Sequence, residues 1–303
     1  MNASDAPHCA NILSTYKWLS QISSKQWIRK CGLTPHLLVC IIFILSTSIA
    51  TIIEHQTEAI AQSTNIALYP RDGRQLLTSS DHEQFPGAGV LMCDTELGIP
   101  ERAAAAWLIG AHDLVLLNAH NFIDKYLSPT RPVTDCYFRI GGRDFYFDPD
   151  TLRTGLSNKS NELHITDDWA LLKLLQPTPE DIRPQPVPNP AMIGTSKNLD
   201  VIMISPAGHS NTQIFETLEH CKIHRIDEPS EGGMRRVRHD CNDGYGGSGS
   251  GIFTADGNLL ALHSASLDMN IKRDFDIETH YGSALIIEGD LASSIRDILS
   301  DTK

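Results

Sequence analysis

The sequence has few positively charged residues for its size. Its 303 residues include 25 Lys and Arg against 37 Asp and Glu, which gives a net charge of −12. Non-specific binding of nucleic acid needs a basic face, so the composition argues against nucleic acid as a partner. The sequence also contains no internal repeat. Because 41% of the residues are hydrophobic and only 20% are charged, a packed globular core is expected.

Acidic residues are almost absent from the first 53 residues. Only Asp5 stands there against four basic residues, a balance of +3, so the remainder carries −15 (−12 minus 3). Within this segment, 17 residues from Leu37 to Ile53 carry no charge; basic residues precede them and Glu54 follows. This pattern is typical of a signal peptide or a short membrane anchor, and the alternative is a buried core helix.

Residues 1–61 are therefore predicted to be a basic cytoplasmic segment plus a signal or membrane-anchor helix. The acidic remainder would be exported to the periplasm or the extracellular space. If residues 37–53 are not cleaved off, they would tether the protein to the inner membrane.

The exported part contains an even number of cysteines, Cys93, Cys136, Cys221 and Cys241. In an oxidising compartment this predicts two disulfides, for which three connectivities exist. We favour Cys93–Cys136 and Cys221–Cys241, because each pair then lies within one half of the domain. The alternative is a zinc site, but its spacing fits no familiar zinc pattern; its candidate ligands are His220, Cys221, His224, His239 and Cys241.

Helical periodicity is rare between residues 65 and 287. Short β-like runs broken by Gly, Pro, Asn and Asp predict an all-β sandwich or a pair of barrels. A stretch with six prolines, 176–190, predicts a surface-running connector between a first barrel in 62–175 and a second in 191–303. The candidate strands are 89–92, 105–109, 114–118, 136–140, 145–147, 169–174, 201–204, 213–216, 252–253, 259–263 and 283–287.

One helix is predicted at the end of the chain, over residues 290–299. Asp290 is placed to cap it. The spacing puts four apolar residues on one face, which we expect to dock on the second barrel; they are Leu291, Ile295, Ile298 and Leu299.

Ser248 lies inside a cluster of glycines, in the stretch Gly-Gly-Ser-Gly-Ser-Gly over residues 246–251. Glycines on both sides of a serine let the backbone take positive φ and approach a ligand closely. A nucleophilic serine needs an exposed hydroxyl and backbone N–H groups directed at the developing oxyanion. Taken alone, the stretch fits a Gly/Ser turn between two strands equally well, and Ser250 is the alternative nucleophile.

Two further stretches offer the partners of a nucleophilic serine. An apolar strand ends in Ala-His120, whereas His112 also follows an alanine but has no apolar strand before it. Asp168 opens the apolar run Trp-Ala-Leu-Leu. Its neighbour Asp167 would face the other way on a strand, so only one of the two carboxylates can meet the histidine.

Together these stretches resemble the chymotrypsin-like serine proteases, in the chain order His120, Asp168, Ser248, spaced 48 and 80 residues apart. The variants G-x-S-G-S and D-W-A-L resemble the bacterial branch that includes the glutamyl endopeptidases. Asp-Gly-Arg at 72–74 resembles the D-x-R found near the mature start of that branch. The resemblance covers roughly residues 70–300 and implies two antiparallel six-stranded β-barrels with a C-terminal helix.

The resemblance also implies a role for each residue. Ser248 would be the nucleophile, His120 would take its proton, and Asp168 would fix the histidine tautomer. The backbone N–H groups of Gly246 and Ser248 would form the oxyanion hole. Gly247 stands where animal proteases keep an aspartate that pairs with a new N-terminus, so activity should not require an exposed N-terminal amine.

Two residues bear on specificity and point in opposite directions. His263 matches the position where glutamyl endopeptidases place a histidine that binds an acidic side chain. Asp243, five residues before Ser248, would lie on the pocket wall and would favour a basic substrate. His263 is otherwise a core histidine. The sequence leaves this choice open.

The resulting prediction is an exported serine endopeptidase that acts on proteins or peptides through an acyl-enzyme, without a metal or an organic cofactor. One alternative is a catalytically inactive protease fold used as a binding module, although all three triad positions are filled. The other is a non-proteolytic serine esterase. The chain order and the absence of a strand–G-x-S-x-G–helix elbow count against an esterase.

Overall fold

The computed structural model of the chain describes residues 68–157, 160–188, 198–207, 216–242, 247–266 and 273–301. The run at 37–53, predicted to be a signal or an anchor, lies outside these residues. Within the described ranges, no helix is both long and apolar enough to cross a membrane.

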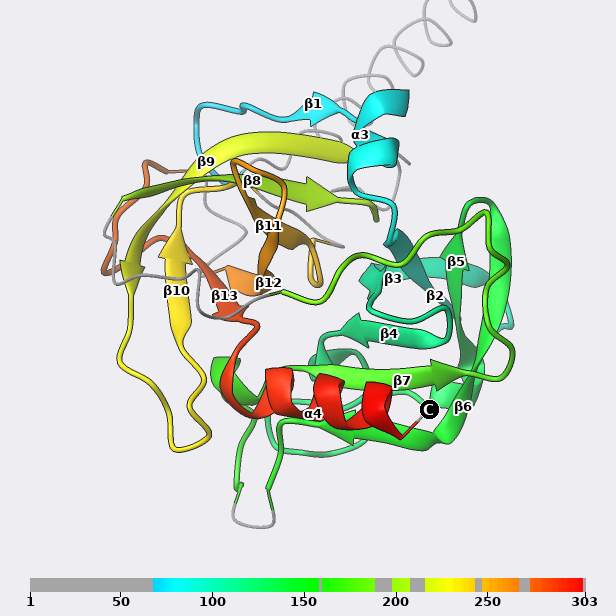
Figure 1. Cartoon of the computed structure of the whole chain (residues 1–303). Helices are drawn as coiled ribbons and strands as arrows, with labels where there is room; N and C mark the ends of the chain where they lie inside the picture. The colour runs from blue at the N-terminus through cyan, green and yellow to red at the C-terminus, as the bar shows by residue number, and fades with distance from the viewer. Residues whose placement is uncertain are drawn as a thin grey trace, which may run out of the picture. The chain divides into compact units, whose positions relative to one another are not determined.

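Six antiparallel strands close the first barrel in the order β2-β3-β4-β7-β6-β5 (Figure 1). Buried apolar runs form several of its strands, as in β4, where all four residues are buried. Such runs favour strands that are covered on both faces. The bounds are β2 Ala88–Asp94, β3 Pro100–Leu108, β4 Leu114–Leu117, β5 Cys136–Ile140, β6 Arg143–Thr154 and β7 Ala170–Leu174.

The second barrel is also closed, because β8 pairs with both β11 and β9 in the order β8-β9-β10-β13-β12-β11. A short strand, β1 (Gln75–Leu76), pairs with β9 from outside the ring. The prediction of an all-β fold with two six-stranded barrels is therefore confirmed. The bounds are β8 Leu199–Ser205, β9 Thr217–Ile226, β10 Arg236–His239, β11 Gly251–Thr254, β12 Leu259–Ser266 and β13 Gly282–Ile286.

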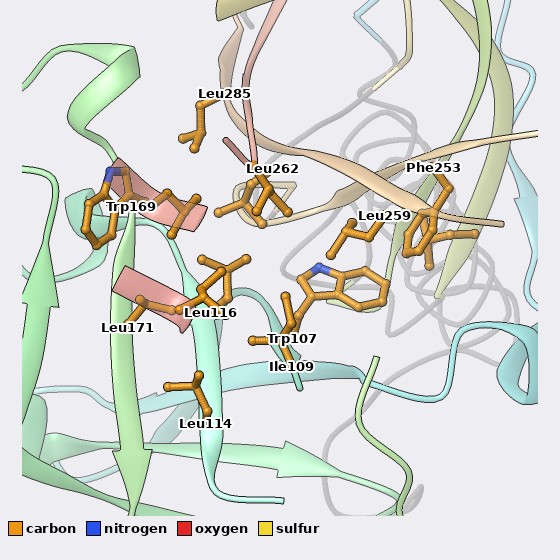
Figure 2. Packing of buried hydrophobic residues seen from close by; sticks show 14 of the residues in the cluster. Trp107, Ile109, Leu114, Leu116, Trp169, Leu171, Phe253, Leu259, Leu262 and Leu285 are labelled. Carbon is orange, nitrogen blue, oxygen red and sulfur yellow. The ribbon is translucent and has the colours of Figure 1, made fainter. Parts of the chain in front are cut away.

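The two barrels share one hydrophobic core, which Figure 2 shows from close by. Trp107 of β3 packs edge-on against Phe253 of β11, with ring centroids 5.1 Å apart. Both side chains are fully buried, so the contact removes large apolar surfaces of both barrels from water. The barrels are thereby fixed against each other. Other members of this core are Ile109, Leu114, Leu116, Trp169, Leu171, Leu259, Leu262 and Leu285.

The C-terminal helix, α4 (Gly289–Ser300), is present, but two expectations about it were wrong. The residue at its N-cap is Glu288, without a side-chain cap, and Asp290 lies in the first turn. The apolar face also does not dock on the second barrel alone. Leu291, Ile295 and Ile298 join the shared core together with residues of β4 and β7, and α4 runs beside β7 in Figure 1. The helix thus covers the seam between the barrels.

Most described residues of the proline-rich connector are exposed or half-buried, and a few are buried against the first barrel. The strands on either side of it end at Leu174 and begin at Leu199. In between, Ile182 and Gln185 are only 6% and 3% exposed. Gln185 accepts from the N–H of Gly110 (2.9 Å) and donates its own N–H to Leu108 (2.8 Å). These backbone bonds attach the connector to the first barrel.

Both predicted disulfides are present. Cys93 on β2 is bonded to Cys136, directly opposite on β5, and Cys221 on β9 is bonded to Cys241 after β10. The pairing removes the thiolates that the alternative zinc site needed, so that alternative was wrong. Two disulfides are typical of a protein that folds in an oxidising compartment.

The predicted strands overlap observed strands, apart from 213–216, most of which lies outside the described residues. Strands β1, β9 and β10 were not predicted. β9 mixes charged with apolar residues, and β10 has Val237 as its single apolar residue, so pairing with neighbouring strands outweighs their local pattern. Short helices were also missed: α3 (Ser79–Gln84) and the 3-10 turns η1 (Ala119–Asn121), η2 (Val133–Asp135) and η3 (Ile165–Asp167).

Candidate active site

Strand pairing brings His120 and Asp168 together. β4 pairs with β7 so that Leu117 lies opposite Ala170. His120 follows the end of β4 in η1, and Asp168 lies between η3 and the start of β7. Two residues 48 positions apart therefore meet at one end of this strand pair.

Asp168 binds His120 through both of its carboxylate oxygens. Oδ2 accepts a hydrogen bond from Nδ1 of His120 at 2.7 Å, and Oδ1 accepts the backbone N–H of the same residue at 2.9 Å. Asp168 is only 3% exposed, so water does not compete for these bonds. Since a carboxylate only accepts, Nδ1 carries the proton, which leaves the lone pair of a neutral imidazole on Nε2.

Two more side chains hold Asp168 in place. Ser264 on β12 donates its hydroxyl hydrogen to Asp168 Oδ2 in a short bond. Asn118, the N-cap residue of η1, donates its amide to the backbone oxygen of Asp168 at 2.9 Å. Both are buried, so Asp168 is fixed from the first barrel and from the second.

The pKa of His120 lies above its ordinary value of 6.5. Burial lowers this pKa, but the charge of Asp168 and the hydrogen bond to it raise it more. The ring is not sealed from solvent, because 32% of the side chain is exposed. His120 is thus a histidine that is held firmly at one nitrogen and remains accessible, as a proton acceptor must be.

The first barrel clamps the turn that carries Ser248. The N–H of Ala105 donates to the carbonyl oxygen of Ser248 at 2.8 Å, and Trp107 Nε1 donates to that of Gly249 at 2.8 Å. Gly249 has φ of +80°, and a Cβ there would lie 2.0 Å from Ala105 O. Glycine is therefore required at this position by both backbone conformation and space.

Ser248 reaches the other two residues through Ser264. Its hydroxyl donates to the backbone oxygen of Ser264 at 3.5 Å, while the Ser264 side chain binds Asp168. Among the described residues, this is the one hydrogen bond of the Ser248 hydroxyl, and none joins it to His120. The structure thus brings His120 and Asp168 into direct contact. Ser248 is connected to Asp168 only through Ser264, which hydrogen-bonds to both.

The competing residues lie elsewhere or are inaccessible. His112 Nδ1 contacts the Thr178 hydroxyl at 3.1 Å, away from Asp168. The Asp167 carboxylate accepts from the Thr166 hydroxyl at 3.5 Å and does not bind His120. Ser250 is 0% exposed. Gly246 of the predicted oxyanion hole and Asp243 of the predicted pocket lie outside the described residues.

His263, the other predicted pocket residue, is buried on β12 beside a second histidine. His239 Nε2 and His263 Nδ1 are 3.0 Å apart. The N–H of Cys241 donates to His239 Nδ1 at 3.2 Å, so that nitrogen is unprotonated. A neutral His239 then carries its proton on Nε2 and donates it to His263 Nδ1. The proton of a neutral His263 is consequently on Nε2, where it is a donor.

Sequence reasoning missed Ser264, Asn118 and His239. Ser264 directly follows His263, and Asn118 lies two residues before His120. An isolated serine on a strand, or an asparagine at the start of a 3-10 turn, carries no local pattern that marks its partner. Only the pairing of distant strands shows that Ser264 and Asp168, 96 residues apart, are in contact.

The comparison with solved structures supports the fold. No family model matches the sequence, and no curated protein matches it. A solved structure of a Glu endopeptidase in complex with MPD is 14% identical, with a TM-score of 0.54, over 77% of this chain and 99% of that chain. The HtrA-type protease AlgW with decapeptide is 15% identical, with a TM-score of 0.45, over 72% of this chain and 65% of that chain. The first likeness establishes the chymotrypsin-like protease fold.

Proposed function

We propose that this protein is an exported serine endopeptidase in which Ser248, His120 and Asp168 form the catalytic triad. The observation that carries the proposal is the buried Asp168 carboxylate, bound to both the ring and the backbone of a partly exposed histidine. A buried carboxylate that fixes one imidazole nitrogen leaves the other ready to act as a base. The substrates are proteins or peptides, and the residues named here need no metal or organic cofactor.

The proposed reaction runs through two displacements at the scissile carbonyl carbon. Nε2 of His120 takes the Ser248 hydroxyl proton as Oγ bonds to the carbon, and the carbonyl oxygen becomes an oxyanion. The C–N bond then breaks and the leaving amine takes the proton from Nε2. Water repeats the sequence on the acyl-enzyme: Nε2 accepts its proton, the acid product leaves, and the proton returns to Ser248.

The backbone N–H groups of Gly246 and Ser248 are the proposed donors to the oxyanion. Removing one such donor typically lowers kcat by about 10²–10³-fold. For catalysis, Ser248 must exchange the hydrogen bond of its hydroxyl to the Ser264 backbone oxygen for one to Nε2 of His120. Catalytic hydrogen bonds are often long before substrate binds, and the exchange of Ser264 O for Nε2 is such a change.

For specificity, we propose that His263 selects an acidic side chain. The hydrogen bond between the His263 and His239 rings supports this proposal, because it orients an imidazole whose protonated nitrogen would donate to a carboxylate. The ratio of kcat/KM for matched peptides with Glu and Lys before the scissile bond tests this. A preference for Lys would assign the pocket to Asp243 instead and would leave the triad untouched.

The two disulfides support export of the acidic part of the chain. Tethering through residues 37–53 is the further proposal for the uncleaved form. Fractionation of cells that produce the full chain tests it: an anchored form stays with the inner membrane after washing with high salt, and a cleaved form does not.

Labelling with a fluorophosphonate probe tests the triad. The label should appear on Ser248, be absent in Ser248→Ala and be strongly slowed in His120→Ala. Ser250→Ala is the matched control, because it removes a neighbouring serine hydroxyl that is fully buried. This variant should still be labelled on Ser248. A folded chain that is never labelled at Ser248 would instead be a binding module. Labelling together with hydrolysis of esters but not of peptides would indicate an esterase.

A further inference from the structure

The residues directly before β1, Leu68–Arg74, are fixed onto the second barrel; we call them the strap. Leu68 and Tyr69 are only 2% and 5% exposed. His280 Nε2 donates to the carbonyl oxygen of Leu68 at 3.2 Å, and the Tyr69 ring packs edge-on against the His280 ring, with centroids 5.5 Å apart. The strap is thereby held where it begins.

The strap grips Asn242 at both ends of its side-chain amide. The N–H of Tyr69 donates to Asn242 Oδ1 at 2.8 Å, and Asn242 Nδ2 donates to the carbonyl oxygen of Arg71 at 2.9 Å. Asn242 is 1% exposed and lies six residues before Ser248. The strap therefore contacts a residue that shortly precedes, in the sequence, the turn around Ser248 and Gly249, which we call the nucleophile turn.

Glu219 on β9 connects the strap to the same asparagine. Its Oε1 accepts the N–H of Gly73 at 3.1 Å and Nδ2 of Asn242 at 3.0 Å, while Oε2 accepts the backbone N–H of Asn242. The side chain is 5% exposed. Three N–H donors thus converge on one carboxylate. The ionised form accepts these bonds more strongly than the protonated acid, which carries a hydrogen on one of its two oxygens.

The Asp-Gly-Arg stretch shapes the strap for this contact. Asp72 accepts from the backbone N–H of Arg74 at 3.2 Å and from its Nε at 2.8 Å, which closes a tight turn around Gly73. A Cβ at Gly73 would lie 2.9 Å from Glu219 Oε1. Glycine is therefore what allows the backbone to approach the carboxylate.

We propose that the strap holds the nucleophile turn in its active position and that Glu219 is the positioning residue through which it does so. This inference rests on the proposed function, because the turn in question carries the proposed nucleophile. The contacts come from backbone groups inside the chain, so the strap acts without a free N-terminal amine.

The arrangement depends on pH. Burial raises the pKa of Glu219 to about 7, although the hydrogen bonds from Asn242 and Gly73 lower it; nearby Asp72 raises it further. Most charged groups around it are paired with each other: Asp72 with Arg74, Asp200 with Lys222, and Asp240 with His224. Glu219 lines a cavity of about 640 Å³, and Arg71, His220 and Asp274 are other ionisable residues along it. Below pH 7, a protonated Glu219 presents a hydroxyl to one of its three donors, and the turn loses part of its support.

Two ionisations should then limit the rate on the acid side. One is that of His120, whose pKa lies above 6.5, and the other is that of Glu219. In the full chain, the acid limb of log kcat against pH should be steeper than a one-proton curve. In Glu219→Gln, the slope of this acid limb should fall to that of a one-proton curve. The same variant should lower kcat at pH 8.5 by about tenfold, the effect of losing one buried hydrogen bond to a charged group. The matched control is Glu216→Gln, which neutralises a more exposed acid beside β9 that faces His82.

Hydrogen exchange of the Gly73 and Asn242 amides tests the strap without requiring activity. It is measured in the full chain carrying Ser248→Ala, with rates corrected for their intrinsic dependence on pH. Protection of both amides should fall as the pH drops through 7, and should be low at every pH with Glu219→Gln added. Gly73→Ala, which displaces the carboxylate without changing charge, should also lower the protection of Asn242; circular dichroism shows that each variant is folded.

Unchanged protection of Asn242 in Glu219→Gln would overturn the proposal. A loss of protection with an unchanged acid limb would overturn the link between the strap and the nucleophile. If the protein never reacts at Ser248 but the exchange results are as expected, the proposed function fails while the connection from strap to turn stands.

Discussion

Ser264 and Asp168 are joined by a hydrogen bond from the Ser264 hydroxyl to Oδ2, the same oxygen that accepts Nδ1–H of His120. The two residues come from different barrels, so this bond crosses the interface between them. Ser264 also presents its backbone oxygen to the Ser248 hydroxyl. One residue of the second barrel, Ser264, therefore contacts both Asp168 and the proposed nucleophile Ser248.

Ser264→Ala should lower kcat/KM by about 10–100-fold, because the buried carboxylate loses a hydrogen bond worth about 1.5–3 kcal/mol. KM should change little, since the bond does not touch substrate. Ser264→Thr, which keeps the hydroxyl, should retain more activity than Ser264→Ala. Ser283→Ala, a buried serine on neighbouring β13, is the control. Equal losses in the Ala and Thr variants would show that volume, not the hydroxyl, matters there.

The pKa of His120 should be visible in stability as well as in rate. Because its folded-state pKa lies above 6.5, the contribution of its charged form is fully present below pH 6.5. That contribution disappears as the pH rises through the folded pKa. The difference in unfolding free energy between the wild type and His120→Gln should therefore shrink between pH 6 and pH 8.5, as measured by urea unfolding. A difference that does not vary with pH would contradict this.

Much of the architecture could be predicted because the strands that build the first barrel carry buried apolar runs. The ends of two such runs also marked His120 and Asp168, whose meeting follows from the pairing of β4 with β7. Two of the three missed strands, β9 and β10, are rich in charged residues. They form because neighbouring strands satisfy their backbone groups, which a local pattern cannot show.

The supporting residues of the site could not be predicted for a related reason. Glu219 and Asn242 are 23 residues apart, and Ser264 and Asp168 are 96 apart. Each of them is an ordinary polar residue in its own stretch of sequence. Their importance comes from burial together, where an unpaired polar group would be unfavourable. The docking position of α4 was also predicted wrongly. Its apolar face shows that the helix packs on a hydrophobic surface, but not which one.

The disulfide Cys221–Cys241 should affect specificity as well as stability. Replacing both cysteines by Ala should lower the free energy of unfolding by about 3 kcal/mol, as expected for a loop of this length. The backbone N–H of Cys241 also orients His239, and through it His263. The ratio of kcat/KM for Glu and Lys peptides should therefore fall in this variant. The Cys93→Ala/Cys136→Ala variant should be destabilised with the ratio unchanged. A ratio that changes equally in both variants would argue against a role of Cys241 in the pocket.

Activity should not depend on a new N-terminus. Gly247 offers no carboxylate that could pair with an amine. The strap groups that bind Asn242 and Glu219 are the N–H of Tyr69, the carbonyl of Arg71 and the N–H of Gly73. These groups are present whether or not residues precede Leu68. A cleavage sequence for a specific protease, placed directly before Leu68 in the full chain, allows kcat/KM to be compared before and after cutting.

The two values should agree within about twofold, a difference of roughly 0.4 kcal/mol. Glu219→Gln should lower activity by the same factor in the cut and the uncut protein, because the strap acts through its interior in both. A rise of tenfold or more on cutting would mean that a free amine does activate the enzyme. In that case the amine would need an acidic partner other than residue 247, and the uncut form would behave as a zymogen.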